Sequence, residues 1–280
     1  MSKSKQSIKL VIVVDNRAEN PFISEHGFSL WIKTDSHTIL FDTGNQGALL
    51  HNGKQLNLDF PSVSDLVISH GHYDHTGGIQ DVLKMAPKAK IYMHQNAIQP
   101  RYSLKNNKAE PVRMPATSWR QLDHMSDMAF HWATKPIHLT DTIGVTGPIP
   151  RKTEYEDTGG SFFFDEDCTL PDLIMDDIAM WLQTPQGLVV CVGCCHAGIV
   201  NTLDAITSIT GEQRIHTVIG GLHLLHATES RLQKTADALN DMNIGNIVAC
   251  HCSGDASIEY LHTHLRCVVQ QGYAGLSLNF

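Results

Sequence analysis

The stretch that decides the fold reads Ile68-Ser69-His70-Gly71-His72-Tyr73-Asp74-His75-Thr76-Gly77-Gly78-Ile79. It places three histidines and one aspartate within six residues, directly after an apolar run. Neutral imidazoles and carboxylates are ligands that zinc, iron and manganese accept. Because alternate residues of an extended chain share one side, His70 and His72 can bind one ion, and Asp74 and His75 can face a second. A histidine-rich surface loop is the alternative, but four potential ligands at this spacing favour a metal site.

The H-x-H-x-D-H pattern of residues 70–75 resembles the signature of the metallo-β-lactamase superfamily. Phe41-Asp42-Thr43-Gly44 is similar to that family's first motif, whose aspartate supports the site. Four further stretches resemble one branch, the proteins related to dihydropterin-aminobenzene-phosphate synthase: Glu25-His26-Gly27 and residues 193–198, 220–224 and 251–254. The resemblance implies an α/β fold, namely an αββα sandwich of two mixed sheets with helices on the outer faces. It also implies a dinuclear metal site along one edge of the sheets.

Length and composition limit the domain organisation and the partners. The 280 residues could form one large domain or two small ones, and 42% hydrophobic residues are enough for a proper core. No internal repeat appears, and both halves read as strands with outer helices, so we expect a single metallo-β-lactamase-like domain over residues 1–280. The net charge of −8 argues against a general nucleic-acid surface, which would be basic. We expect a small anionic molecule as substrate, and the oligomeric state is left open.

The sequence also indicates a compartment. Residues 1–7 are polar, and the apolar run that follows, residues 10–14, is too short for the core of a signal peptide. No run approaches the roughly 18 apolar residues of a membrane span. The seven cysteines are odd in number and mostly lie in apolar runs or beside histidines. We therefore expect reduced thiols in a cytoplasmic protein without membrane contact.

Apolar patterning predicts strands that alternate with helices. The expected strands cover residues 8–14, 27–33, 37–41, 65–69, 90–94, 142–146, 178–183, 188–192, 215–219 and 247–250. The expected helices cover residues 46–55, 78–85, 199–209 and 229–242. Such alternation implies parallel strand pairing, with helices on the outer faces of the sheets.

Residues 95–132 interrupt this alternation. They show no clean period and carry three prolines, which predicts an irregular insertion that serves as a lid or binding loop. Their basic residues could meet an anionic group of the substrate, with ordinary solvated charges as an equal alternative. These residues are Arg101, Lys105, Lys108, Arg113 and Arg120.

Several expected strands end directly before a histidine-bearing turn, at Ser69, Gly193, Gly221 and Cys250. Because α/β folds place their sites at the carboxyl edges of strands, one shared metal centre explains these histidines better than separate buried ones. In the family pattern that the sequence resembles, His70 and His72 would hold a first ion, and Asp74 and His75 a second. His251 matches the late histidine of that pattern.

The middle of the chain departs from the family pattern. After the strand 188–192 the family shows Gly-Asp, with the aspartate bridging both ions, whereas here Gly193 is followed by Cys194. No His-Thr-x-Gly element precedes that strand, so His196 is the candidate for the missing ligand of the first ion. Without the bridging carboxylate, one ion could be weakly held or absent. Cys194 and Cys195 could bind a soft metal, but buried thiols before a helix are the commoner arrangement.

The remaining candidates act around the ligands. Asp42 is expected to support the site, in place of an ordinary turn or cap role. His223 is either a further ligand or a general acid near the substrate, and Asp74 could serve as a base if its ligation is weak. Glu25 and His26 could form an ordinary surface pair, but the branch resemblance implies that they contact the substrate. Arg151 is a further candidate substrate contact.

These residues predict a metal-dependent hydrolase that acts on a small anionic ester, lactone or phosphate. We expect two divalent ions, zinc first, with manganese or iron as alternatives, which would lower the pKa of a bound water toward about 7. The branch resemblance implies an alternative, a transferase of the synthase type, for which Trp119 or residues 162–164 could stack on a flat ring. A third possibility is a non-hydrolytic metal or redox sensor that uses the neighbouring cysteines.

Overall fold

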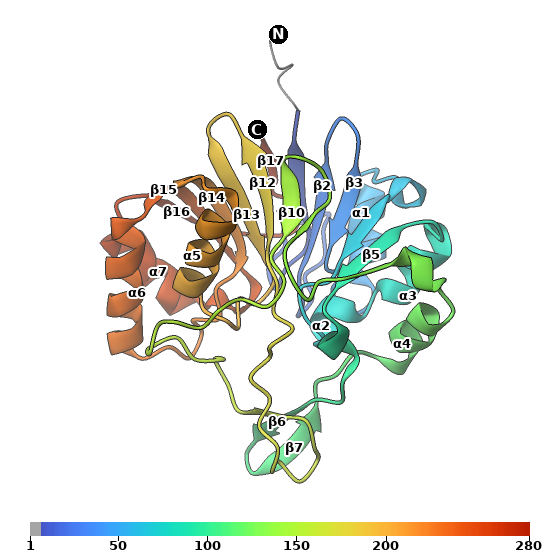
Figure 1. Ribbon diagram of the computed structural model, residues 1–280, viewed down its shortest axis with the longest axis horizontal. Coiled ribbons are helices and arrows are strands. Elements are labelled where there is room, and N and C mark those ends of the chain that lie inside the picture. The colour runs from blue at the N-terminus through green and yellow to red at the C-terminus, as the bar shows by residue number, and fades with distance from the viewer. Residues whose placement is uncertain (1–6) are drawn as a thin grey trace.

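The computed structural model describes residues 7–280, and the polar residues 1–6 lie outside the described part. Two sheets pack face to face (Figure 1), and each has seven strands. The first sheet contains, in spatial order, β17 (Ser277–Asn279), β1 (Lys9–Val14), β2 (Ser29–Lys33), β3 (Thr38–Phe41), β4 (Asp65–Val67), β5 (Lys90–Met93) and β8 (Phe130–Trp132). The second contains β16 (Val268–Gln271), β15 (Asn243–Cys250), β14 (Arg214–Gly221), β13 (Gly187–Val192), β12 (Met180–Thr184), β10 (Ile143–Val145) and β9 (Ile137–His138).

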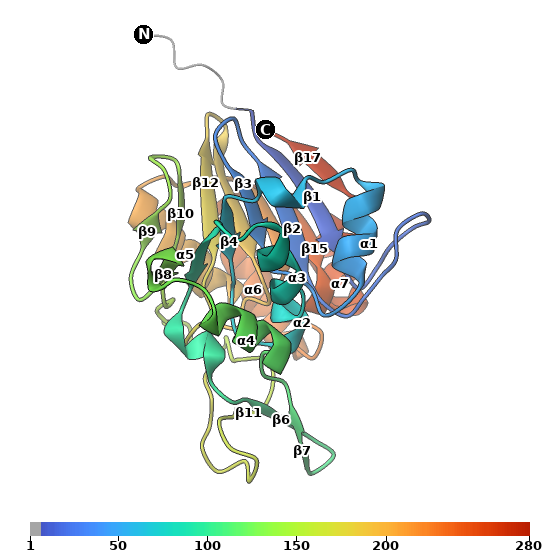
Figure 2. The same cartoon turned by 90° about the vertical axis from the view of Figure 1, so that its right-hand side faces the viewer.

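Helices cover the outer face of each sheet (Figures 1 and 2). Beside the first sheet lie α1 (Ala48–Gln55), α3 (Ile79–Met85) and α4 (Ala116–Asp123), with the short α2 (Tyr73–Thr76) at its lower edge. Beside the second lie α5 (Ile199–Thr210), α6 (Glu229–Asp241) and α7 (Asp255–His264). Single 3₁₀ turns are η1 (Phe60–Ser62), η2 (Gln95–Ile98), η3 (Asp127–Ala129) and η4 (His251–Ser253). The predicted αββα sandwich is confirmed.

The apolar strands are buried on both faces. In β1, Leu10 and Ile12 pack between the two sheets, whereas Val11 and Val13 pack beneath the helices. Because both faces are covered, the strand reads as an unbroken apolar run rather than as an alternating one. Within residues 7–280, none of the helices combines the length and the apolar character needed to cross a membrane.

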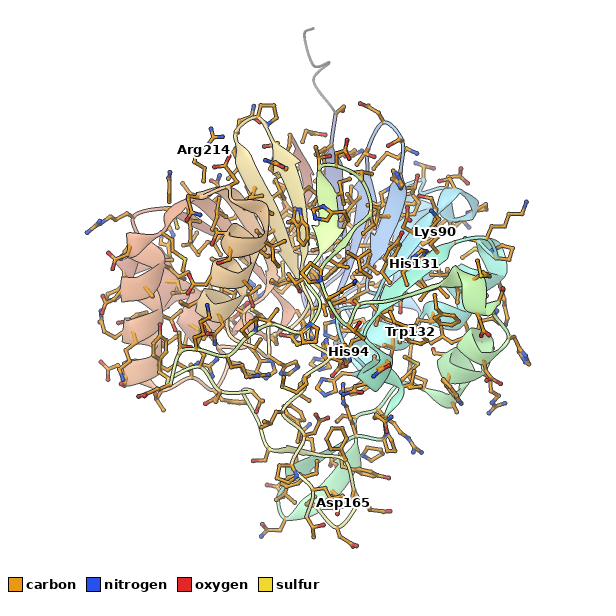
Figure 3. All side chains as sticks on the ribbon, in the orientation of Figure 1. Lys90, His94, His131, Trp132, Asp165 and Arg214 are labelled. Carbon is orange, nitrogen blue, oxygen red and sulfur yellow. The ribbon has the colours of Figure 1, made fainter. Side chains whose placement is uncertain are left out.

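The segment 95–132 differs from the predicted irregular insertion. Its second half joins the sandwich, because α4 packs beside α3 and β8 pairs in parallel with β5. Only β6 (Tyr102–Lys105) and β7 (Lys108–Pro111) protrude as a hairpin, and β11 (Phe162–Phe163) pairs with β6 to form a third, small sheet. Figure 3 shows Asp165 on the chain that runs out beside this hairpin. The lid role stays a prediction and now concerns this small sheet.

Candidate metal centre

The candidate ligands lie at the carboxyl edge of the strands, at the lower side of the sandwich in Figure 1. Strands β3, β4 and β5 run parallel in the first sheet, and β13, β14 and β15 run parallel in the second. Parallel strands bring their carboxyl ends to one edge of a sheet. The turns after β4, β13, β14 and β15 therefore meet, and they bring together histidines that are up to 181 residues apart, from His70 to His251.

A first group consists of His70, His72 and His196. His70 Nε2 lies 2.9 Å from His72 Nδ1, and the rings of His70 and His196 are 4.7 Å apart between centroids. His196 Nε2 is buried without a hydrogen-bond partner among the described residues. Burial lowers the pKa of all three imidazoles well below the usual value, so they are neutral. Neutral imidazoles are the form that binds metal ions.

A second group consists of Asp74, His75 and His251. Asp74 Oδ2 lies 3.3 Å from His251 Nε2 and 3.9 Å from His75 Nε2. Burial would raise the pKa of the Asp74 carboxyl, but the neighbouring histidines outweigh it and hold that pKa well below its usual range. Burial would likewise lower the pKa of His75, but Asp42 and Asp74 raise it to about 9. The negative field that these carboxylates create favours a positive charge at this position.

Asp42 lies behind the ligands and orients them. Its Oδ1 accepts from the Ser69 amide at 2.7 Å, and its Oδ2 accepts from the Ser69 hydroxyl and faces His75 Nδ1, each at 2.7 Å. The Ser69 hydroxyl lies 2.9 Å from His70 Nδ1. Because the outer nitrogen of each ring is engaged, the inner nitrogen of His70 and of His75 is directed into the centre. These contacts suit the supporting role expected of Asp42, which stays a prediction.

The other histidines are held in the same way, by residues that sequence reasoning missed. His196 Nδ1 lies 2.8 Å from the carbonyl oxygen of Thr158, and His251 Nδ1 lies 2.8 Å from Asn16 Oδ1. Asp15 accepts a hydrogen bond from the His251 amide at 2.8 Å. The pair Asp15-Asn16 directly follows a buried strand, which is the signal that identified the histidines. Thr158 contributes only its backbone, for which the sequence carries no signal.

The backbone of the site is strained. Positive φ angles occur at Asp42 (58°), Cys195 (60°), His223 (48°) and His251 (46°). Side chains other than glycine rarely adopt this region, and such residues gather at functional sites. These conformations turn the chain sharply just after the strands and aim the ligands inward.

Two of the predicted substrate contacts have structural roles instead. Both carboxylate oxygens of Glu25 accept hydrogen bonds from backbone amides, from Asn45 at 2.8 Å and from Ala48 at 3.2 Å, so Glu25 stabilises the start of α1. Arg151 donates to the carbonyl oxygens of His196 and Leu173, at 2.7 and 2.5 Å. These donors are therefore occupied with the backbone. Neither residue lines the cavity described below.

His26 and His223, in contrast, lie at the centre. His26 Nε2 is 3.2 Å from Asp74 Oδ2, and its side chain is 57% exposed, so it faces both the site and the solvent. The His223 ring is 4.3 Å from that of His196, and its Nδ1 is buried without a hydrogen-bond partner among the described residues. Burial lowers the pKa of His223, but the negative sulfur of Cys252, whose own pKa is held well below its usual range, outweighs burial, so the pKa of His223 is raised.

A cavity of about 390 Å³ opens onto these residues. Its walls include Asp74, His223 and His251, and beyond them Lys105 from β6 and Phe162 from β11. Of the basic residues predicted to meet a substrate, Lys105 lines this cavity. Arg101 does not reach a substrate, because it is completely buried and paired with Asp172 and Asp176. The arrangement can hold one or two divalent cations beneath a cavity that is sized for a small molecule and lined by both polar and apolar side chains.

Comparisons with known proteins agree with this geometry. Residues 25–166 match the family model of the metallo-beta-lactamase superfamily. The chain is 30% identical over 264 residues to 7,8-dihydropterin-6-methyl-4-(beta-D-ribofuranosyl)-aminobenzene-5'-phosphate synthase from Methanocaldococcus jannaschii, which covers 89% of this chain and 88% of that protein. A crystal structure described as a metal-dependent hydrolase of the beta-lactamase superfamily is 28% identical, covers 97% of this chain and 98% of that chain, and superposes with a TM-score of 0.83. The metallo-beta-lactamase fold protein YhfI from Bacillus subtilis is 11% identical with a TM-score of 0.61, covers 99% of this chain and 100% of that chain, and shows the shared fold alone.

Proposed function

Because the chain belongs to the metallo-β-lactamase superfamily, in the branch related to dihydropterin-aminobenzene-phosphate synthase, we propose that it is a metal-dependent hydrolase of a small anionic ester, lactone or phosphate. The observation that carries this proposal is the convergence of histidine and aspartate side chains from both sheets on one centre, where His72, Asp74 and His251 line the cavity. The donor set fits divalent cations, because it combines the neutral imidazoles of His70, His72 and His196 with the ionised carboxylate of Asp74. The buried His196 Nε2 has no partner within residues 7–280.

The proposed centre has two positions. His70, His72 and His196 would hold the first ion. Asp74, His75 and His251 would hold the second, with Asp42 orienting both groups. When bound, zinc ions, or manganese or iron ions, would lower the pKa of a water molecule and polarise the oxygen of a carbonyl or phosphoryl group.

Asp74 suits the role of ligand better than that of base. Its pKa lies well below the usual range, since His75, His251 and His26 surround the carboxylate. A carboxylate with so low a pKa takes up a proton poorly near neutral pH. His26 is half exposed beside Asp74 and lines the cavity, so it is placed to contact the substrate directly.

We assign His223 as a general acid. Its ring lines the cavity, its Nδ1 has no hydrogen-bond partner within residues 7–280, and its pKa is raised. A protonated imidazole there could deliver a proton to a departing oxygen of the substrate. The hairpin β6–β7 with β11 forms the outer wall of the cavity, and we propose that it acts as the lid, with Lys105 placed to meet an anionic group.

The test is a hydrolysis assay with a lactone, a carboxylic ester, a phosphomonoester and a phosphodiester. We expect turnover of at least one class that a chelator removes and added metal restores. His196→Ala should reduce the rate by about a hundredfold or more, because it removes a ligand. His131→Ala is the matched control, since His131 stacks on Tyr92 in the first sheet and does not line the cavity (Figure 3). Turnover that survives the chelator would overturn the proposal.

One observation favours a second function, transfer of the synthase type. The relative from Methanocaldococcus jannaschii is named as a synthase of a dihydropterin aminobenzene phosphate, and its similarity extends over 89% of this chain. The Phe162 ring lies in the cavity wall, 4.9 Å from the His72 ring and 5.4 Å from the His196 ring. A flat ring of a substrate could stack there.

Product analysis separates the candidates. Incubation with a reduced pterin and an aminobenzene ribose phosphate gives a joined product only if the transferase is correct. Activity on simple phosphodiesters or lactones alone supports the hydrolase. A coloured protein that turns over neither substrate type would instead support a metal or redox sensor.

A further inference from the structure

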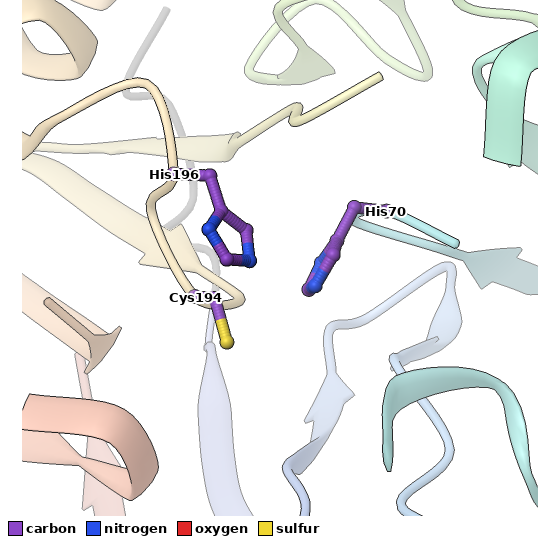
Figure 4. A group of neighbouring side chains, drawn as sticks. All are labelled: His70, Cys194 and His196. Atoms are coloured by element: carbon purple, nitrogen blue, oxygen red, sulfur yellow. The ribbon is translucent and has the colours of Figure 1, made fainter. Parts of the chain in front are cut away.

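The side chain of Cys194 lies between the two groups of candidate ligands. Its Sγ forms one cluster with ring nitrogens of His70 and His196, and a second cluster with those of His75 and His251. It also lies in a third cluster, with His223 and Cys252. Within each cluster, the ligand atoms all lie within 4.8 Å of one another. Figure 4 shows the thiol beside the rings of His70 and His196, whose planes lie at 72° to each other. Cys194 is thus common to both proposed metal positions.

The backbone fixes this placement. A Cβ atom on Gly193 would lie 2.1 Å from Ser69 Oγ and 2.9 Å from Asp42 Oδ2, so the chain after β13 passes directly against the residues that orient the ligands. The next side chain is thereby delivered into the centre. Its Sγ lies 3.2 Å from His75 Nε2, and Cys194 is only 3% exposed. A residue other than glycine at 193 would displace this turn.

We propose that Cys194 is a thiolate ligand shared by the two metal positions. It thereby occupies the place where the sequence lacks the family's bridging aspartate. The inference rests on the metal centre of the proposed function. Thiolate is a ligand that zinc and iron accept, and it is softer than a carboxylate. The metal–sulfur bond forms as the S–H bond breaks, and the thiol proton leaves to solvent.

Cys195, the next residue in the same turn, makes a structural contact. Its Sγ lies 3.3 Å from Thr202 Oγ1 of α5, and Cys195 belongs to none of the ligand clusters. A serine hydroxyl at 195 can keep the contact with Thr202. Cys195→Ser is therefore the matched control for substitutions of Cys194.

The experiment uses the full chain loaded with Co²⁺, because a thiolate bound to cobalt gives a near-ultraviolet charge-transfer band that imidazole and carboxylate ligands do not give. We expect this band in the unchanged protein and in Cys195→Ser, and its loss in Cys194→Ser and Cys194→Asp. Elemental analysis should show weaker metal retention in Cys194→Ser, by about tenfold or more. Cys194→Asp should retain metal like the unchanged protein, because its carboxylate can bridge.

The outcomes separate this inference from the proposed function. Cobalt bound without the band, or a band that persists in Cys194→Ser, overturns the shared thiolate and leaves the metal centre intact. A band lost in Cys252→Ser but kept in Cys194→Ser assigns the sulfur ligand to Cys252, which also overturns it. A protein that binds no cobalt, zinc, manganese or iron overturns the metal centre, and the thiolate ligand with it.

Discussion

Asp42 determines which nitrogen of His75 is available to a metal ion. Its completely buried carboxylate accepts from the Ser69 amide and hydroxyl and faces His75 Nδ1, so the proton stays on Nδ1 and Nε2 is directed toward Asp74 and Cys194. The backbone there has a φ of 58°, which aspartate and asparagine tolerate better than most residues. Asparagine is therefore the substitution that tests the charge without adding backbone strain.

We predict that Asp42→Asn folds but holds metal about 10- to 100-fold more weakly. The amide would present a donor to His75 Nδ1, which moves the ring proton to the nitrogen that should bind the ion. Metal affinity is measured by competition with a chromogenic chelator, and the fold by circular dichroism. An affinity equal to that of the unchanged protein would show that Asp42 does not set the tautomer.

At the scale of elements, two loops pass each other so closely at the site that only glycine fits. A Cβ on Gly77, at the end of α2, would lie 1.6 Å from the carbonyl oxygen of Asn45. The φ of Gly77 is −64°, which alanine also adopts, so the restriction is purely steric. Gly47, two residues beyond Asn45, has a φ of −88°, and a Cβ atom added there would meet no other atom within 4 Å.

We predict that Gly77→Ala lowers the free energy of unfolding by about 1–3 kcal/mol, because the added methyl forces two backbones apart. Gly47→Ala should change it by only a few tenths of a kcal/mol, because the loss of a favoured N-cap residue is offset by the lower conformational entropy of the unfolded chain. Urea unfolding of the chelator-treated proteins gives both values. Equal effects of the two substitutions would contradict a specific contact between the loops.

The hairpin β6–β7 offers a second pair of matched substitutions, at two lysines. Lys105 and Lys108 face each other across the turn, but of the two only Lys105 lines the cavity. We predict that Lys105→Ala raises KM for an anionic substrate about two- to fivefold, the size of an exposed charge interaction. The kcat value and the metal content should not change, and Lys108→Ala should have no effect. Equal KM values for both variants would argue against this lid contact.

The sequence predicted those elements that have a strong local pattern of apolar residues, and it missed those that lack one. Strands such as β13 and β15 are dense apolar runs, and the histidines that follow their ends lie close together in the structure. The short edge strands β9 and β17 carry too few residues for a pattern, and their pairing depends on distant partners. The sequence left a substrate contact open for Arg101, because its buried partners, Asp172 and Asp176, are more than 70 residues away along the chain. Such tertiary pairing leaves no local trace.

At the scale of the whole molecule, the packing of the two halves around the site buries the carboxyl group of Asp177, and no cation fully neutralises it. Asp177, just before β12, accepts a hydrogen bond from the Ala197 amide at 2.7 Å, and burial raises the pKa of its carboxyl to about 7. The usual value of about 3.8 applies to the unfolded chain. Between about pH 4 and 7, the folded state therefore keeps a proton that the unfolded state has already lost. Asp177 thus contributes stability at low pH that is lost as the pH rises through 7.

We predict that Asp177→Asn, whose amide oxygen can still accept from Ala197, removes this contribution. Its free energy of unfolding, relative to that of the unchanged protein, should rise steadily from about pH 4 to pH 7 and level off above, by about 1.4 kcal/mol for each unit of pKa difference. Denaturant unfolding of the metal-free proteins across this range tests it, because bound ions would add their own pH dependence. Curves that stay parallel from pH 4 to 8 would mean that the Asp177 carboxylate is ionised in the folded state. The acid would then be neutralised by Arg151 or His223, the nearby positive groups that act on it.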